Sequence, residues 1–136
     1  MAGRLDGRVI VVTGGASGIG AAMCRGFAAE GAAVTIADLN NELASSLAEE
    51  ITASGGEALA VAMDVTKRDQ VKAGIDATVK EFGKLDAYFN NAGMNSPMKL
   101  LDVTEENFDL IMKVNVLGVL IGMQEAAKQF IAQGSG

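Results

Sequence analysis

The segment that most constrains the fold of this chain is the glycine-rich stretch TGGASGIG at residues 13–20. It follows the apolar run Val9–Val12 and leads into a helical pattern at residues 21–30. A buried strand that ends in a glycine-rich turn at the start of a helix is typical of a phosphate-binding site. Glycine lets the backbone approach a phosphate closely, and the first amides of a helix have no partners inside it. The stretch therefore predicts a nucleotide-binding turn.

The rest of the chain alternates apolar strand patterns with helical patterns, which predicts a parallel sheet joined by right-handed crossovers. The predicted fold is α/β, a Rossmann-type doubly wound parallel sheet with strand order 3-2-1-4 that stops after the fourth strand–helix unit. We expect a single domain over residues 1–136. The expected strands are residues 9–12, 33–37, 57–63 and 85–89, and the expected helices are residues 18–30, 41–53, 67–82 and a final region from residue 104 with an interruption near residue 118.

Polar residues mark where three of these helices begin, because their side chains can accept a hydrogen bond from the first turn. Asn40 or Asn41 is expected to cap the second helix, Thr66 the third and Thr104 the last. Glycines follow the first three helical patterns and are expected to end them.

Composition narrows the class of protein. Hydrophobic residues make up 49% of the chain and charged residues 21%, which fits a globular domain with its own core. The net charge of −6 argues against a nucleic-acid partner. The longest nearly apolar run, residues 114–123, is about half as long as a membrane span, and the N-terminus lacks the apolar core of a signal peptide. We therefore expect no membrane partner.

The chain has one cysteine and no histidine. Cys24 lies in the first helical pattern, where a small buried side chain is the simplest interpretation, and a lone cysteine excludes an internal disulfide. This cysteine usage favours a reducing, cytoplasmic location. The lack of histidine removes the commonest general base and the commonest metal ligand, so no metal site is predicted.

An acidic residue at the end of the second strand points to the nature of the nucleotide. Asp38 comes 18 residues after Gly20, as does the carboxylate that binds the ribose hydroxyls in NAD-binding folds. A carboxylate would repel the 2′-phosphate of NADP, and residues 15–17 offer no Arg or Lys to pair with that phosphate. The sequence therefore favours NAD over NADP. The alternative for Asp38 is a solvated carboxylate at a strand end.

The spacing of the glycine motif and the segment Asn90-Asn91-Ala92-Gly93 together resemble the short-chain dehydrogenase/reductase family over essentially the whole chain. The resemblance implies that Asp64 contacts the adenine amine and that the backbone amide of Val65 contacts the adenine ring. It also implies that Asn115 is the helix asparagine of the catalytic tetrad, bending its helix around a water in a proton relay; the alternative is an asparagine satisfied by the backbone. The predicted cofactor-binding residues are Thr13, Gly14, Ser17, Gly18, Ile19, Gly20, Asp38, Leu39, Asp64, Val65, Asn91, Ala92 and Gly93.

The remaining catalytic groups of that family do not match this chain. The family uses a serine and a Tyr-x-x-x-Lys pair, because the oxyanion left by hydride transfer needs a proton donor with a lowered pKa. The one tyrosine, Tyr88, lies in the fourth strand pattern and is followed four positions later by Ala92. The resemblance is to the N-terminal half of such an enzyme, and the other groups would fall after Gly136.

Four functional hypotheses follow. The first is the cofactor half of an NAD-dependent dehydrogenase acting on an alcohol, polyol or ketone. The second is a module that binds NAD or its adenosine half without catalysis. A different Rossmann-like enzyme, such as a methyltransferase, fits the motifs less well, and a purely structural dimerisation module would bind no nucleotide.

An exposed strand edge and an apolar last helix predict self-association. With no fifth strand, the outer edge of the fourth strand keeps unpaired backbone groups. The last helix is rich in apolar residues between residues 114 and 123, and in the family this helix often packs against a second subunit. We expect a homo-oligomer, either a dimer or a tetramer.

Overall fold

A computed structural model describes residues 3–136. The elements in chain order are β1 (Val9–Thr13), α1 (Gly18–Ala29), β2 (Ala33–Asp38), α2 (Asn41–Ala53), β3 (Glu57–Ala62), α3 (Arg68–Phe82), β4 (Ala87–Phe89), the 3-10 turn η1 (Leu100–Asp102), α4 (Glu105–Met112), the π-helical turn η2 (Lys113–Leu117) and α5 (Gly118–Gln133). The four strands form one sheet in the order β3-β2-β1-β4, and every pair is parallel. The predicted Rossmann-type sheet is therefore confirmed.

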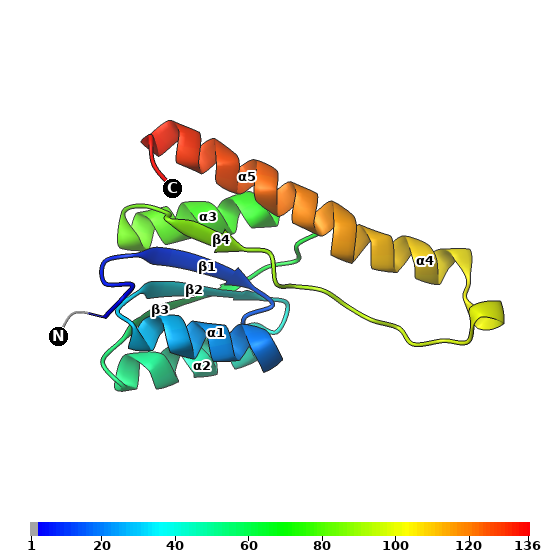
Figure 1. Cartoon of the computed structure of the whole chain (residues 1–136), viewed down its shortest axis with the longest axis horizontal. Coiled ribbons are helices and arrows are strands. Elements are labelled where there is room, and N and C mark those ends of the chain that lie inside the picture. Colours follow the sequence, from blue (N-terminus) through cyan, green and yellow to red (C-terminus); the bar gives the residue numbers. More distant parts are fainter. Residues whose placement is uncertain (1–2) are drawn as a thin grey trace.

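The sheet is covered on both faces, which is what near-continuous apolar strands require. Figure 1 shows α1 and α2 on one face and α3 with α5 on the other. Each face has its own apolar cluster: Val12, Val34 and Ile36 pack toward α1 and α2, while Val11 and Leu85 belong to the cluster that includes residues of α3 and α5. The central strands β1 and β2 are the most deeply buried elements, and they end at the glycine-rich turn and at Asp38.

Two of the predicted helix caps are confirmed. The Asn40 side chain accepts a hydrogen bond from the Leu43 amide at 3.0 Å, so Asn40 caps α2 and Asn41 is its first residue. The Thr104 hydroxyl accepts one from the Asn107 amide at 3.1 Å at the start of α4. Both caps satisfy amides that the helix leaves without an internal partner.

The prediction that Thr66 caps α3 is wrong. The helix begins at Arg68, and its N-cap residue is Lys67, which makes no side-chain capping bond. The Thr66 hydroxyl instead donates to the Asp64 carboxylate at 2.7 Å, and the Thr66 amide donates to the same oxygen at 2.9 Å. The carboxylate that directly follows β3 and Met63 is a stronger acceptor than the hydroxyl, so it orders this loop into a tight turn before the helix starts.

The last helical region is interrupted, as predicted, and the interruption is the π-helical turn Lys113–Leu117 next to Gly118. Two glycines of α5 allow close packing. A Cβ at Gly118 would lie 2.8 Å from Val65 Cγ2, and one at Gly122 would lie 2.9 Å from Tyr88 Cε1. The G-x-x-x-G spacing therefore serves contacts of α5 with the sheet side of this chain.

The continuous helical stretch Glu105–Gln133 is long and apolar enough to cross a membrane by length and composition alone. Its most apolar window has a mean hydropathy of 1.4 and is 28% buried. One such helix is weak support for a membrane span, because core helices of soluble proteins pass the same test. Part of this stretch packs on α3 and β4, while α4 projects beyond the sheet (Figure 1).

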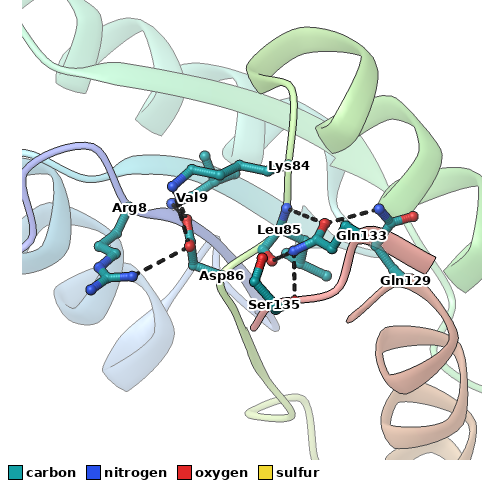
Figure 2. Close-up of polar contacts among 8 residues, drawn as sticks. All are labelled: Arg8, Val9, Lys84, Leu85, Asp86, Gln129, Gln133 and Ser135. Atoms are coloured by element: carbon teal, nitrogen blue, oxygen red, sulfur yellow. Dashed lines mark hydrogen bonds and ion pairs between the residues drawn. The ribbon is translucent and has the colours of Figure 1, made fainter. Parts of the chain in front are cut away.

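Two polar clusters hold the residues that directly precede β4, and Figure 2 shows both. The Asp86 carboxylate accepts from the Val9 amide at 2.8 Å and pairs with Lys84 at 2.9 Å and Arg8 at 3.5 Å. Burial opposes the charged form of Asp86, but these partners outweigh it and hold the pKa of this carboxyl below its usual range. The cluster fixes the start of β4 against β1.

The second cluster covers the outer side of the same strand. The Gln133 carboxamide, at the end of α5, accepts from the Leu85 amide at 3.2 Å and donates to the Leu85 carbonyl (Figure 2). The Asp86 amide donates to Val9 of β1, so the polar groups of Leu85 face the opposite edge. Gln133 thus pairs with that edge as a neighbouring strand would, and it shortens the row of unpaired backbone groups.

Candidate functional site

The glycine-rich turn between β1 and α1 adopts a conformation that requires glycine at several positions. Gly14 and Gly18 have φ angles of +61° and +54°, in the left-handed region that side chains disfavour. A Cβ at Gly20 would collide with the Gly14 carbonyl and lie 2.7 Å from Asn91 Nδ2. The motif therefore brings the first turn of α1 directly against the backbone of the glycine-rich turn and the end of β4.

The end of β4 holds this turn from one side. Asn91 Nδ2 donates to the carbonyls of Thr13 and Gly14 at 3.0 and 3.2 Å. The Thr13 hydroxyl accepts from the amides of Asn91 and Ala92 at 3.1 and 3.0 Å and donates to the Phe89 carbonyl at 3.1 Å. Thr13 is 1% exposed, so it braces β1 against β4 from behind the site.

The end of β2 holds the turn from the other side. The Gly15 amide donates to the Ala37 carbonyl at 3.2 Å, and the next amide, that of Ala16, donates to Asp38 Oδ2 at 3.0 Å. Asp38 Oδ1 also accepts from the Asn40 amide at 2.9 Å. Asp38 therefore faces the turn directly, and it is not the solvated strand-end carboxylate that the sequence left as an alternative.

The N-terminus of α1 opens toward the same space. Ser17 is the N-cap residue in an extended conformation, and its side chain makes no capping hydrogen bond. The first amides of a helix and the positive end of its dipole attract an anion, and glycines at the preceding positions let a phosphate come close. The arrangement is suited to a pyrophosphate.

The loop after β3 supplies a second carboxylate. Asp64 accepts from both the amide and the hydroxyl of Thr66, and the Asp64 amide donates to Gln70 Oε1 at 2.8 Å. The hydrogen bond from the Thr66 hydroxyl, helped by the charges of Lys67 and Lys113, holds the pKa of Asp64 below its usual range. Asp64 is therefore ionised at neutral pH and can accept a hydrogen bond from an amino group.

Asn115 lies in the π-helical turn and is held by the loop after the Asn-Asn-Ala-Gly segment. Its Oδ1 accepts from the Met94 amide and its Nδ2 donates to the Met94 carbonyl, both at 2.8 Å. The side chain is thus satisfied by the backbone of a distant loop. The π-helical turn around it is a type of irregularity that is frequent at functional sites.

These segments surround a cavity of about 520 Å³ at the carboxyl ends of the strands. In doubly wound sheets, ligands bind at the carboxyl ends of the strands, where the strand order reverses. In this sheet the order reverses between β1 and β4. Every predicted cofactor-binding residue lines the cavity except Thr13, which braces it from behind, and Gly18. The lining residues are Gly14, Ser17, Ile19, Gly20, Asp38, Leu39, Met63, Asp64, Val65, Asn91, Ala92, Gly93, Met94 and Val114.

Comparison with known proteins identifies the family of this chain. The sequence model of the short chain dehydrogenase family matches residues 8–136. The chain belongs to this family. A solved short-chain type dehydrogenase/reductase from Mycobacterium marinum superposes with a TM-score of 0.93 at 36% identity, covering 97% of this chain and 53% of that one.

Two curated relatives illustrate the range of the family. The 2,5-dichloro-2,5-cyclohexadiene-1,4-diol dehydrogenase of Sphingobium indicum is 40% identical over 100% of this chain and 54% of its own length. The secoisolariciresinol dehydrogenase of Forsythia intermedia is 41% identical over 100% of this chain and 49% of its own length. The chain spans about half the length of the curated relatives that it matches.

Within this short-chain dehydrogenase site, three lining residues were not predicted from the sequence. Met63, Met94 and Val114 are apolar, and each directly adjoins a residue that was predicted. They supply the apolar walls that a flat ring such as adenine needs beside a few polar contacts. Their positions next to Asp64, Gly93 and Asn115 were the only available signal.

Cys24 is a core residue, and Tyr88 is half-buried against the core. Burial raises the pKa of the Cys24 thiol to about 12, which leaves it protonated and unreactive. Burial likewise raises the pKa of Tyr88, whose hydroxyl contacts the Met63 sulfur at 3.7 Å. A tyrosine in this state lacks the nearby cation that makes a tyrosine an effective acid, so neither side chain is suited to proton transfer or nucleophilic attack.

Proposed function

We propose that this chain is the dinucleotide-binding half of an oxidoreductase that transfers a hydride between NAD and an alcohol, polyol or ketone. The observation that carries the proposal is the position of Asp38 beside the phosphate-binding turn, in a cavity that is also lined by Asp64. The turn suits a pyrophosphate, Asp38 suits the adenosine ribose, and Asp64 with the Val65 amide suits the adenine.

The charge of the cavity supports NAD over NADP. Its lining includes the carboxylates of Asp38 and Asp64 and no Arg or Lys. A carboxylate accepts hydrogen bonds from two ribose hydroxyls, but it repels a 2′-phosphate in a partly buried site. Selective binding of NADP would require a cation near the adenosine ribose.

The substrate class rests on the family and on the names of its members. The two relatives described above are named as dehydrogenases of 2,5-dichloro-2,5-cyclohexadiene-1,4-diol and of secoisolariciresinol. We assign the substrate end of the site to Gly93 and Met94, which line the cavity, and to Asn115, whose side chain holds the Met94 backbone. We assign Asn115 to the proton relay through its helix. We propose further that the chain by itself binds the cofactor without turning it over, because the half-buried Tyr88 has a raised pKa and no Lys four positions later.

Calorimetric titration of this chain with NAD, NADP and ADP-ribose tests the proposal. We expect binding of NAD and ADP-ribose, weaker binding of NADP, and no NADH absorbance when NAD is mixed with a panel of alcohols. NADH formation by the isolated chain would overturn the binding-only part. A lack of nucleotide binding would overturn the cofactor assignment and favour a structural module instead.

We also propose that the protein acts in the cytoplasm as a homo-oligomer. The outward face of α4 and α5 supports association, because it exposes large apolar side chains in one stretch of helix. The side chains with more than a third of their surface exposed are Phe108, Leu110, Met112, Val116, Leu117, Leu120, Met123 and Ile131.

A further inference from the structure

Asp38 joins three segments of the site. Its Oδ2 accepts from the Ala16 amide in the phosphate-binding turn at 3.0 Å, and its Oδ1 accepts from the Asn40 amide at the start of α2 at 2.9 Å. We propose that Asp38 is a positioning residue for the phosphate-binding turn, in addition to its assigned contact with the adenosine ribose. This inference rests on the proposed function, since it concerns how the same site binds a dinucleotide.

The Asp38 carboxylate has enough acceptor positions to hold the turn and to bind the ribose. An ionised carboxylate offers about four lone-pair positions, two on each oxygen. In Asp38 each oxygen receives one protein amide. One position therefore remains on each oxygen, which is what two ribose hydroxyls need. The number of acceptor positions therefore allows ribose binding and the contact with Ala16 at the same time.

The turn needs this contact because little else fixes its last residues. Two successive amides, those of Gly15 and Ala16, are held by the end of β2, and only the second is held by a side chain. Ser17, the next residue, makes no side-chain cap. The bond from Ala16 to Asp38 is therefore the side-chain restraint nearest to the helix N-terminus that receives the phosphate. A hydrogen bond to a charged acceptor is among the stronger ones in a protein.

If Asp38 only bound the ribose, its removal would have a different effect on the affinity for the phosphates than if it also positioned the turn. The Asp38 charge repels a nearby pyrophosphate, so its removal alone would leave unchanged, or tighten, the binding of a nucleotide that has no ribose hydroxyls. If Asp38 also positions the turn, its removal weakens the binding of that nucleotide. The sign of the change separates the two roles.

The experiment compares ADP with its 2′,3′-dideoxy analogue, which keeps the adenine and the pyrophosphate. We expect Asp38→Ala to weaken binding of the dideoxy analogue by about tenfold, the value of one hydrogen bond to a charged group, and to weaken ADP binding further. The matched control is Asp76→Ala, which removes an exposed carboxylate of α3 that pairs with Lys72 and does not line the cavity. It should bind both nucleotides as the unmutated chain does.

Amide hydrogen exchange gives a readout that needs no ligand. We expect the Ala16 amide to exchange faster in Asp38→Ala, and also in Asp38→Asn, whose carboxamide has a single acceptor oxygen for two amides. Asp38→Asn serves where the alanine variant does not fold. Unchanged or tighter binding of the dideoxy analogue, or unchanged exchange at Ala16, would overturn the inference. Failure of the unmutated chain to bind ADP would instead overturn the proposed function, and the exchange result would still decide the role of Asp38 in the turn.

Discussion

The β1–α1–β2 unit and the β4–α4–α5 region differ in how completely they bury their apolar residues. All five residues of β1 and the first five of β2 are buried, and both strands have neighbours on each side. β4 has three residues and no buried position, and α4 likewise has none. The β1–α1–β2 unit therefore buries most of its apolar strand residues, whereas the β4–α4–α5 region leaves many apolar side chains exposed.

The same difference separates the residues that we assign to the two ends of the cofactor. The turn and Asp38, which we assign to the phosphates and the adenosine ribose, lie at the ends of the buried strands β1 and β2. The turn is held by hydrogen bonds from Asp38 on one side and from Asn91, which follows β4, on the other. Met94 and Asn115, toward the substrate end, lie on a loop and on a helix that are braced chiefly by each other. Tight nucleotide binding therefore requires less of the second region than catalysis does.

Substitution of one isoleucine in each region should give the largest contrast. Ile36 in β2 is 0% exposed and Ile131 in α5 is 81% exposed. We expect Ile36→Ala to lower the free energy of unfolding by about 2–5 kcal/mol, because it leaves a cavity in the core. Ile131→Ala should change it by less than about 0.5 kcal/mol. Urea unfolding at equal m-values measures both, and similar losses would show that the two regions are equally packed.

Two glycines of α1 test how closely the turn must pack. Gly20→Ala places a Cβ against the Gly14 carbonyl and 2.7 Å from Asn91 Nδ2, and the overpacking should weaken ADP binding by about 5- to 100-fold. Gly26→Ala in the same helix meets no atom within 4 Å. This control should bind ADP normally and gain about 0.5–1 kcal/mol of stability, because alanine favours a helix. Titration and thermal unfolding distinguish the two, and normal binding by Gly20→Ala would contradict the geometry.

The sequence predicted the well-buried unit better than the exposed region. Apolar runs rich in β-branched residues located β1 and β2, and the glycine and aspartate residues at their ends indicated the segments that we assign to the phosphates and the ribose. These features are local, since strand, turn and helix start follow one another along the chain. The fold class and the strand order followed from the same pattern of alternating elements.

Hydrogen bonds of individual polar side chains were not predictable in the same way. The cap assigned to Thr66 failed because the Asp64 carboxylate competes for its hydroxyl, and periodicity does not describe such competition. The pairing of Gln133 with Leu85 joins residues 48 positions apart. Nothing in the pattern near Gln133 indicates that partner, because periodicity tells which face of a helix is apolar but not which backbone group its polar residues reach.

Self-association through the outer face of α5 provides the third test. Leu120 in α5 and Leu43 in α2 are 47% and 48% exposed, so they are matched in type and exposure. We expect the unmutated chain to associate at tens of micromolar, and Leu120→Lys to raise the dissociation constant by about tenfold through the loss of buried apolar surface. Leu43→Lys should leave it unchanged. Sedimentation equilibrium measures all three, and a monodisperse monomer of the unmutated chain would refute the proposed interface.

The smallest effect concerns the inner face of α5, where Glu125 is 5% exposed and is paired with Lys128 at 2.7 Å and Arg68 at 2.6 Å. Hydrogen bonds from these cations hold the pKa of Glu125 below its ordinary value of 4.5. Because the pKa is lowered in the folded state, the stabilisation is fully present above the unfolded value and is lost as the pH falls through the folded value. The free energy of unfolding, measured between about pH 6 and pH 3, should therefore fall less steeply with decreasing pH in Glu125→Gln than in the unmutated chain.

The control for this pH dependence is Glu49→Gln on α2, an exposed glutamate for which no ion pair occurs within residues 3–136. The free energy of unfolding of this variant should depend on pH as that of the unmutated chain does. If Glu125→Gln also runs parallel to the unmutated chain, then the ion pairs of Glu125 contribute nothing to holding α5 on α3. In that case α5 would be held by apolar packing and by the hydrogen bonds of Gln133, without a contribution from the ion pairs of Glu125.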